Sequence, residues 1–226
     1  MADGEGAFKR KVVLIFAAAL VVLGVIFFVP AGTLDYWQAW LYIAVLFGPV
    51  IFVLRYFLKN DPEFLKRRMR YKEKEARQKS IIKFAWVIFV IGFLLPGLDR
   101  RFGWSDVPFE LVIAADALVL LGYAQCFLAF RENSYAGRTI LVEKGQKVIS
   151  TGPYSIIRHP MYLGALVMWA ATPIALGSCW ALPPFLLLFP IMVLRILNEE
   201  EVLRRGLPGY SAYCKKTPYR LLPYVW

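Results

Sequence analysis

Long apolar runs separated by short charged segments dominate this chain. Each run is long enough to cross the roughly 30 Å hydrocarbon core of a bilayer as a helix. The runs cover approximately residues 11–30, 36–58, 81–98, 109–130, 161–176 and 181–197. The pattern therefore predicts an all-α, polytopic integral membrane protein with about six transmembrane helices.

Composition supports this interpretation and limits the number of domains. The chain of 226 residues is 59% hydrophobic, and its mean hydropathy is +0.53, whereas soluble domains are roughly 45–50% apolar. Once the apolar runs lie in lipid, little chain is left for a separate soluble domain. We expect one transmembrane domain over residues 1–226, with an N-terminal three-helix part (1–108) and a C-terminal core (109–226).

The last two apolar runs predict a tight helical hairpin. Only the four residues 177–180 separate them, so the two ends of the hairpin must lie close together on one face of the membrane. Arg158, His159 and Tyr162 precede the hairpin, and the acidic triplet 199–201 follows it. We therefore expect these groups to meet at the membrane surface although about forty residues separate them in sequence.

The distribution of charge predicts the orientation. Six spans place both termini on one side, together with the charged segments 59–80 and 131–160 and the basic tail, whereas Arg100 and Arg101 are the basic residues of the opposite side. By the positive-inside rule the first side is the cytosol. The formal net charge of +11 fits loops that face an anionic inner leaflet, so we do not expect nucleic-acid binding.

The segment 59–80 is strongly charged and carries no helix breaker between Pro62 and Lys79. One interpretation is a helix that lies on or beneath the membrane surface. The alternative is a solvated connector that only sets the topology.

Polar residues in and after the fourth run have two possible roles. Asp116 lies inside the run, and because a carboxylate at that depth is costly, it should face protein or a polar cavity. Asn133 and Tyr135 follow where the run leaves the membrane. They either help to close a site near the hairpin ends or only cap the helix exit.

Metal chemistry is not expected. Cys126, Cys179 and Cys214 are widely spaced, and His159 is the single histidine. This set forms neither a disulfide framework nor a metal-ligand pattern, and it excludes a multi-histidine metal site.

The start of the hairpin has the properties of an anion-binding turn. Pro160 suits the first position of a helix, where its missing N–H is harmless, and the free backbone N–H groups there favour an anion such as a carboxylate. Gly164, one turn later, lets a flat ligand or a neighbouring helix approach. Taken alone, Arg158 and His159 could simply snorkel to the interface. Their convergence with the acidic triplet favours a functional site.

Three elements together resemble a known family. They are the segment GPYSIIRHPMYLG (152–164), the pair Glu199-Glu200 with Leu203, and the tail pattern Tyr210, Tyr213, Arg220, Leu221 and Pro223. This combination resembles the isoprenylcysteine carboxyl methyltransferase family, part of a wider group of membrane methyltransferases that includes phospholipid methyltransferases. The resemblance covers roughly residues 110–226.

The resemblance implies a site for S-adenosyl-L-methionine (SAM) on the cytosolic side. The cofactor contacts that it implies are His159, Tyr162, Leu163, Gly164 and Glu199. Arg158 and Glu200 would lie nearest the reacting group and are the implied catalytic residues. The extra Glu201 leaves the choice among the three glutamates open by one position.

The implied reaction is methyl transfer to a membrane lipid or another lipophilic small molecule. A prenylcysteine-type carboxylate, a phospholipid amine or a similar lipophile all fit the sequence. The protein would need only to align the nucleophile with the methyl group and to exclude water. Two alternatives stay open: an NADPH-dependent membrane reductase of sterol-reductase type, and a non-catalytic scaffold or transporter.

Overall fold

The computed structural model describes residues 2–69 and 76–226, and within these ranges all regular structure is helical. The elements in chain order are α1 (Ala2–Ala31), α2 (Trp37–Asn60), α3 (Pro62–Arg68), α4 (Ala76–Phe102), α5 (Phe109–Glu132), the 3₁₀ turn η1 (Gly152–Ser155), α6 (Pro160–Ala175), α7 (Leu182–Gly206) and α8 (Tyr210–Lys216). The predicted all-α class is confirmed.

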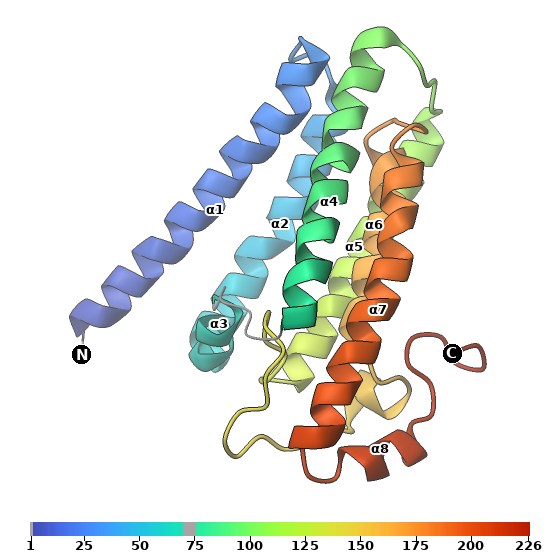
Figure 1. The fold of residues 1–226 in the computed structure, drawn as a ribbon. Helices are drawn as coiled ribbons and strands as arrows, with labels where there is room; N and C mark the ends of the chain where they lie inside the picture. The colour runs from blue at the N-terminus through green and yellow to red at the C-terminus, as the bar shows by residue number, and fades with distance from the viewer. Residues whose placement is uncertain (1, 70–75) are drawn as a thin grey trace.

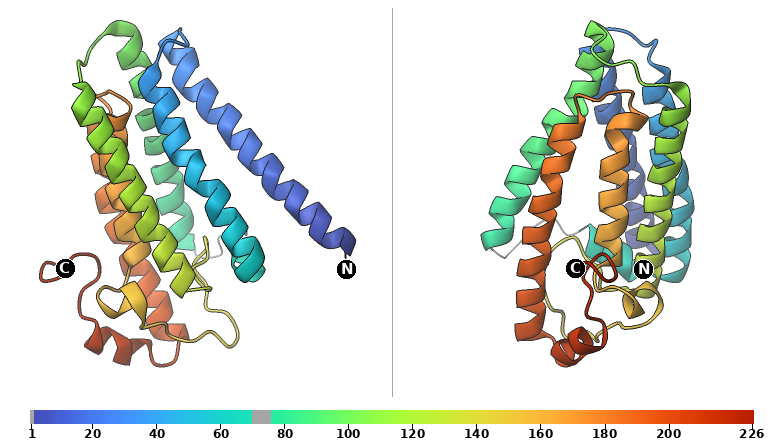
Figure 2. Two further views of the ribbon diagram at one scale, coloured as in Figure 1. Left: turned by 180° about the vertical axis from the view of Figure 1, so that it is seen from behind. Right: turned by 90° about the vertical axis from the view of Figure 1, so that its right-hand side faces the viewer.

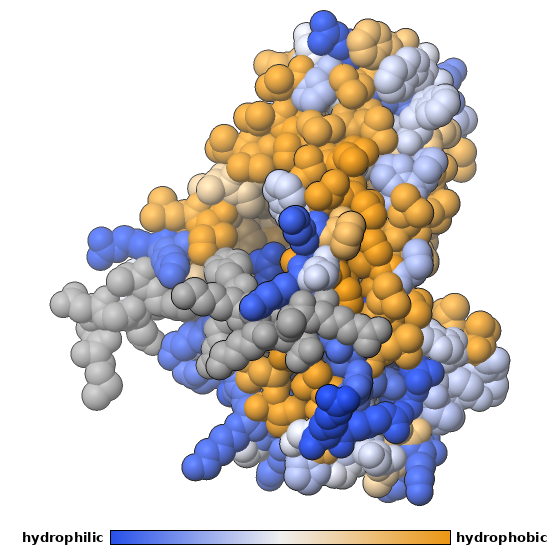
Figure 3. Space-filling model, viewed as in Figure 1, coloured by the Kyte–Doolittle hydropathy of each residue, from blue (hydrophilic) through white to orange (hydrophobic). Residues whose placement is uncertain are grey.

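Five of these helices are long and apolar enough to cross a membrane: α1, α2, α4, α5 and α7. The sixth apolar helix, α6, has 16 residues and is about 24 Å long at roughly 1.5 Å per residue. Hydrophobic residues cover the body of the molecule, and hydrophilic residues gather at its lower end (Figure 3). The chain is therefore a polytopic membrane protein, and its sixth apolar helix is shorter than the other five.

The long helices form a bundle with both termini in its lower half (Figure 1). Among the described residues the most extensive helix packing is between α5 and α6, and α4 packs against α7. Helix α1 leans against the upper end of α4 and diverges from the bundle toward its own N-terminus (Figure 2). At the lower end, α3, η1 and α8 lie around the ends of α5, α6 and α7 (Figure 1), and the candidate site is built there.

Two glycines bring the backbones of α5 and α6 into contact. A Cβ atom added to Gly122 would lie 2.6 Å from the carbonyl oxygen of Gly164, and a Cβ on Gly164 would lie 2.6 Å from that of Gly122. Small residues allow this close approach between membrane helices. The sequence predicted that either a flat ligand or a neighbouring helix approaches Gly164. The structure shows that it is the helix α5.

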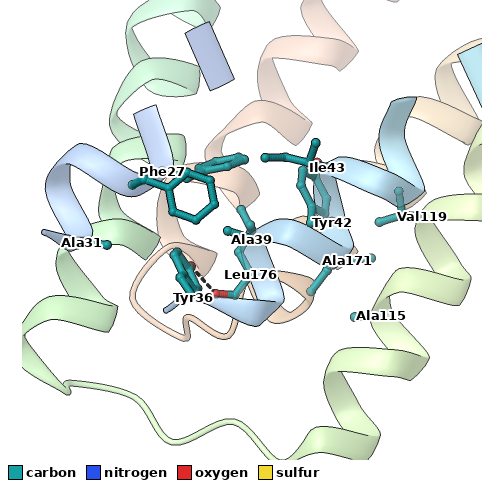
Figure 4. Packing of buried hydrophobic residues seen from close by; sticks show 12 residues of the cluster. Phe27, Ala31, Tyr36, Ala39, Tyr42, Ile43, Ala115, Val119, Ala171 and Leu176 are labelled. Carbon is teal, nitrogen blue, oxygen red and sulfur yellow. Dashed lines mark hydrogen bonds between the residues drawn. The ribbon is translucent and has the colours of Figure 1, made fainter. Parts of the chain in front are cut away.

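An apolar cluster near the upper end ties α6 to the N-terminal helices. It includes Phe27, Ala39 and Ala171 (Figure 4). The Tyr36 hydroxyl donates to the Leu176 carbonyl at 2.5 Å. These contacts fix the end of α6 that lies away from the candidate site. Because a helix is rigid, they also fix the position of the end that carries the site.

The turn between α6 and α7 is anchored on the end of α4. Buried Asp99 accepts hydrogen bonds from the Ser105 hydroxyl at 2.7 Å and from the Ser178 hydroxyl at 2.5 Å. Leu182 then starts α7 four residues after Ser178. The predicted tight hairpin is confirmed.

The charged segment after α2 does not form one continuous helix. Asp61 caps α3 by accepting from the Phe64 N–H at 3.0 Å, and α3 ends at Arg68. Residues 76–79 already belong to α4, and residues 70–75 lie outside the described residues. The interpretation of the segment 59–80 as one surface helix is therefore wrong in extent, because α3 ends at Arg68 and the chain turns at Met69.

Asp116 is buried in α5, with 4% of its surface exposed. Neither of its carboxylate oxygens has a hydrogen-bond partner among the described residues. It faces protein, as expected from the cost of a carboxylate in lipid.

Candidate functional site

The hairpin brings the turn before α6 next to the end of α7. The Arg158 Nε atom lies 2.9 Å from Oε1 of Glu200, and His159 Nε2 lies 3.2 Å from the same oxygen. All three side chains are buried. The predicted convergence of the turn and the acidic triplet is confirmed.

Glu200 is held by four basic side chains. Besides Arg158 and His159, its Oε2 atom lies 3.2 Å from Arg220 Nε and 3.6 Å from Arg204 Nη2. The residue is only 3% exposed, and a buried carboxylate is tolerated only when paired in this way. Glu200 therefore joins α7, the turn before α6 and the C-terminal tail.

The C-terminal tail completes the turn through main-chain bonds. The Arg158 N–H donates to the Tyr219 carbonyl at 2.9 Å, and the His159 N–H donates to the Arg220 carbonyl at 3.0 Å. The Trp226 carbonyl in turn accepts from the Arg220 N–H at 2.8 Å. Two of the donors that precede α6 are thus satisfied by the tail.

A polar cavity of about 100 Å³ lies beside this turn. One side of the cavity is formed by the roof loop, residues 133–149, which follows α5. Its other walls come from η1, the turn before α6, the end of α7, and α8. The lining includes Asn133, Tyr135, Lys147, Val148, Tyr154, Arg158, His159, Tyr162, Arg195, Glu199, Leu207, Tyr210 and Tyr213.

A hydrogen-bonded chain of side chains forms one wall of the polar cavity. The Tyr162 hydroxyl donates to Glu199 Oε2 at 2.5 Å and accepts from Arg195 Nε at 3.0 Å. The His159 ring stacks on the Tyr162 ring, with centroids 5.6 Å apart. Glu199, unlike Glu200, lines the cavity and is available to a ligand.

Two arginines of α3 hold the roof loop in place. Arg67 donates from Nη1 to the Ser134 hydroxyl at 2.8 Å and from Nε to Glu143 at 2.9 Å. Arg68 Nη1 donates to the Gly137 carbonyl at 3.3 Å. A short helix from the N-terminal part of the chain therefore closes the C-terminal site.

Three tyrosines on the lower side of the cavity remain protonated at neutral pH. Burial raises the pKa of Tyr154, Tyr210 and Tyr213 above its ordinary value. The Tyr213 hydroxyl donates to the Tyr154 carbonyl at 2.7 Å, which fixes α8 against η1. These phenols can donate hydrogen bonds but do not serve as bases.

A second, mostly apolar cavity of about 470 Å³ adjoins the first. Its walls come from α2, α4, α5, α6 and α7 and include Val53, Ile82, Trp86, Phe89, Phe127, Ala165, Trp169 and Leu188. Gly137, Met161, Tyr162 and Arg195 line both cavities. A polar and an apolar compartment therefore share one wall.

The seven predicted site residues fall into four groups. Four of them line the polar cavity: Arg158, His159, Tyr162 and Glu199. Glu200 does not line the cavity and pairs with Arg158 and His159. Leu163 packs in an apolar cluster around Leu166, Met192 and Ile196. Gly164 contacts α5 through Gly122, as described above.

The sequence also pointed to Asn133 and Tyr135 as candidate site residues, whereas Arg195 was not predicted. The first two line the polar cavity, and Asn133 is also the C-cap residue of α5, so both predicted roles are compatible with the structure. Arg195 was detectable in principle, since it is a charged residue in an apolar run, four positions before Glu199 and so on the same helix face.

The comparison with known families concerns the C-terminal half of the chain. Residues 111–208 match the family model described as phospholipid methyltransferase. This segment, somewhat less than half of the chain, is similar to the phospholipid methyltransferase family. That family lies within the isoprenylcysteine carboxyl methyltransferase-like group of membrane proteins, so the resemblance noted from the sequence is confirmed. The matched segment contains α6, α7 and all but the first two residues of α5.

Individual proteins similar to this chain carry different names. A Delta(14)-sterol reductase, TM7SF2, of Mus musculus is 34% identical over 105 residues, which cover 43% of this chain and 25% of the mouse protein. The nickel-cobalt-cadmium resistance protein NccN of Alcaligenes xylosoxydans xylosoxydans is 31% identical over 138 residues, covering 59% of this chain and 61% of that protein. The cobalt-zinc-cadmium resistance protein CzcN of Cupriavidus metallidurans is 31% identical over 137 residues, covering 58% of each. The chain thus spans a quarter to about three fifths of the length of these relatives.

Proposed function

We propose that this protein transfers a methyl group from SAM to a lipophilic acceptor. The observation that carries the proposal is the wall shared by a polar and an apolar cavity within a methyltransferase domain. A charged, water-soluble donor fits the polar side, and a lipid chain fits the apolar side. Their reacting ends would then meet at the shared wall.

The residues of the polar cavity suit the chemical groups of SAM. Arg158 and Lys147 can bind its carboxylate. Glu199 can accept hydrogen bonds from its ammonium group or its ribose hydroxyls. Val148 and Leu207 offer apolar contact to its adenine ring. The lining therefore supplies a partner for each part of the cofactor.

When bound, SAM supplies an electrophilic methyl group next to a sulfonium. The protein then needs only to orient the two partners and to exclude water. We propose that Arg158, His159, Tyr162 and Glu199 contact the cofactor, with the reacting groups beside Tyr162, because Tyr162 lines both cavities whereas Arg158 lines the polar one. For Glu200 we propose a positioning role, since it holds both Arg158 and His159.

The size of the polar cavity implies movement of its roof. Its volume of about 100 Å³ is well below the roughly 300–1,000 Å³ of small-molecule pockets. We infer that the loop 133–149 moves outward when the cofactor binds and closes over it afterwards. The positive-inside pattern supports a cytosolic position for this loop and for both termini.

The proposal is tested by calorimetric titration of S-adenosylhomocysteine into the detergent-solubilised protein. Binding is expected for the parent protein, and Glu199→Gln should weaken it roughly tenfold, because a charged hydrogen-bond partner is lost. Glu201→Gln is the matched control and should bind like the parent, since Glu201 pairs with exposed Arg205 at the surface. NADPH binding without binding of S-adenosylhomocysteine would overturn the proposal in favour of a reductase.

A further inference from the structure

The C-terminal tail folds into a loop that closes on itself, and we call residues 221–226 the tail loop. The Trp226 carbonyl accepts from the N–H groups of Arg220 at 2.8 Å and Leu221 at 3.1 Å. The Trp226 N–H donates to the Leu222 carbonyl at 3.1 Å, and the Arg220 guanidinium lies over the Trp226 ring, 5.1 Å from its centroid. The loop therefore has a defined shape.

The tail loop presents apolar side chains both to the helix bundle and to its surroundings. Leu221 is 6% exposed and packs in one cluster with Leu166 of α6 and Ile196 of α7. Three other large side chains of the loop are exposed: Leu222 at 48%, Tyr224 at 89% and Val225 at 77%. Adjacent apolar residues left uncovered in this way mark a contact surface for a membrane or a partner.

Helix α7 gives the depth of the tail loop in the membrane. At the upper end, Trp104 and Trp180 lie 6.2 Å apart and are exposed, as expected of an aromatic belt at one membrane surface. Glu200 follows Leu182, the first residue of α7, by 18 positions, which is about 27 Å along the helix. Because the hydrocarbon core is about 30 Å thick, Glu200 lies near its opposite edge. Arg220 pairs with Glu200 at 3.2 Å and so places the tail at the same level.

The tail loop lies where α6 is too short to fill the membrane. Helix α6 has 16 residues and α7 has 25, so α7 continues downward past the start of α6. At about 24 Å, α6 falls roughly 6 Å short of the hydrocarbon core. The tail rises from α8 to the level of the lower end of α6 (Figure 2) and packs there on α7. An exposed polar main chain would be costly at that depth, whereas apolar side chains suit it.

We propose that Leu222, Tyr224 and Val225 insert into the bilayer leaflet on the side of the candidate site, and that this contact holds the tail against the turn before α6. The partner is a lipid bilayer because the exposed surface of the loop continues that of a candidate membrane span. Leu194 and Leu197 of α7, in that span, are 45% and 41% exposed. Tyrosine at this level is typical of the boundary between membrane and water.

The tail connects this lipid-facing surface to the candidate site. The Tyr219 and Arg220 carbonyls accept from the N–H groups of Arg158 and His159, and the Arg220 side chain pairs with buried Glu200. Movement of the tail loop out of the leaflet therefore removes support from the turn that carries two of the proposed cofactor contacts. The bilayer thus acts as a structural part of the site.

The first test measures the depth of the tail loop in phosphatidylcholine nanodiscs. Val225→Cys is made in a Cys179→Ser background, because native Cys179 is exposed, and is labelled with a nitroxide. Molecular oxygen, which partitions into hydrocarbon, should relax this label more than a water-soluble nickel chelate does. Ala212→Cys is the matched control, since Ala212 is exposed on α8 at the lower tip of the molecule (Figure 1), and its label should show the reverse order.

Two results of this measurement would overturn the proposal. The first is a label at position 225 that is relaxed more by the nickel chelate, because the loop would then lie in water. The second is protection of that label from both reagents, because the loop would then be covered by another protein or by a second copy of this chain.

The second test rests on the proposed function, because it measures the affinity for S-adenosylhomocysteine by calorimetry in nanodiscs. Val225→Asp should weaken this affinity about tenfold, since a carboxylate is costly in the leaflet and draws the loop toward water. Ala212→Asp makes the same change of charge on α8 and should bind like the parent. Val225→Leu keeps an apolar side chain and should also bind like the parent.

The outcomes separate this proposal from the proposed function. Unchanged affinity in Val225→Asp, or equal losses in Val225→Asp and Ala212→Asp, would refute the link between the bilayer and the site. Absence of S-adenosylhomocysteine binding in the parent protein would instead refute the proposed function. The depth measurement uses no ligand, so its result stands in either case.

Discussion

Neutralising Glu200 should destabilise the protein far more than the same change at either neighbouring glutamate. In Glu200→Gln the amide keeps the shape of the side chain but loses its charge. Arg158 and His159, which are 6% and 5% exposed, would then be left without their anionic partner in a buried site. Removing one member of a buried ion pair costs about 3–5 kcal/mol.

Not all four basic partners contribute equally to that figure. The Arg204 side chain is 44% exposed and can turn to water, so its loss of pairing adds little. The cost therefore comes mainly from Arg158 and His159. For a chain of this size about 1 kcal/mol shifts the melting temperature by roughly 2–4 °C, so a decrease of roughly 6–20 °C is expected.

Thermal unfolding of the detergent-solubilised protein measures this shift. Glu201→Gln is the control, because Glu201 and Arg205 are 44% and 75% exposed, and such surface pairs contribute about 0–1 kcal/mol. Its melting temperature should stay within about 2 °C of the parent, since surface changes usually cost about 0.5 kcal/mol or less. Equal shifts for the two variants would refute the assignment of Glu200 as the buried centre of this cluster.

Two other substitutions give independent checks on the fold and the cavity wall. Gly164→Ala should lower stability by about 1–3 kcal/mol, since its Cβ would meet the Gly122 carbonyl at 2.6 Å, whereas Gly48→Ala, with open space around it, should not lower the melting temperature. Equal melting temperatures for these two variants would contradict the close contact. Tyr162→Phe removes the hydroxyl that Glu199 accepts from, so affinity for S-adenosylhomocysteine, measured by calorimetry, should fall roughly tenfold. Undiminished affinity would show that this hydroxyl does not support the cofactor site.

The membrane helices were predictable because insertion into lipid depends on composition over about twenty residues. The run predicted over 36–58 corresponds to α2 at Trp37–Asn60, and the run over 109–130 corresponds to α5 at Phe109–Glu132. The connector of four residues, 177–180, forced the hairpin. Convergence of the two halves of the site then followed from geometry alone.

The separate roles of Glu199 and Glu200 could not be predicted from the sequence. Consecutive residues on a helix point about 100° apart, since a turn takes 3.6 residues. An error of one position therefore exchanges Glu199, which lines the cavity, for Glu200, which faces Arg158 and His159. Only the rotation of α7 against its neighbours decides between them.

The support of Arg195 by Gln78 was also not predictable. The two residues are 117 positions apart, and their contact depends on how α4 packs against α7. Gln78 stands among charged residues at the end of a polar segment, where a solvated side chain is the ordinary expectation. The packing of α4 buries it completely.

The glycine contact between α5 and α6 makes these two helices a stiff frame. Their backbones touch at Gly122 and Gly164, so neither can tilt or slide without a steric clash. Expansion of the apolar compartment around a long hydrocarbon chain is therefore expected to come from its other walls, which include α4. Spin labels on α4 and α5 would then separate when a lipid enters, while the spacing between α5 and α6 stays constant.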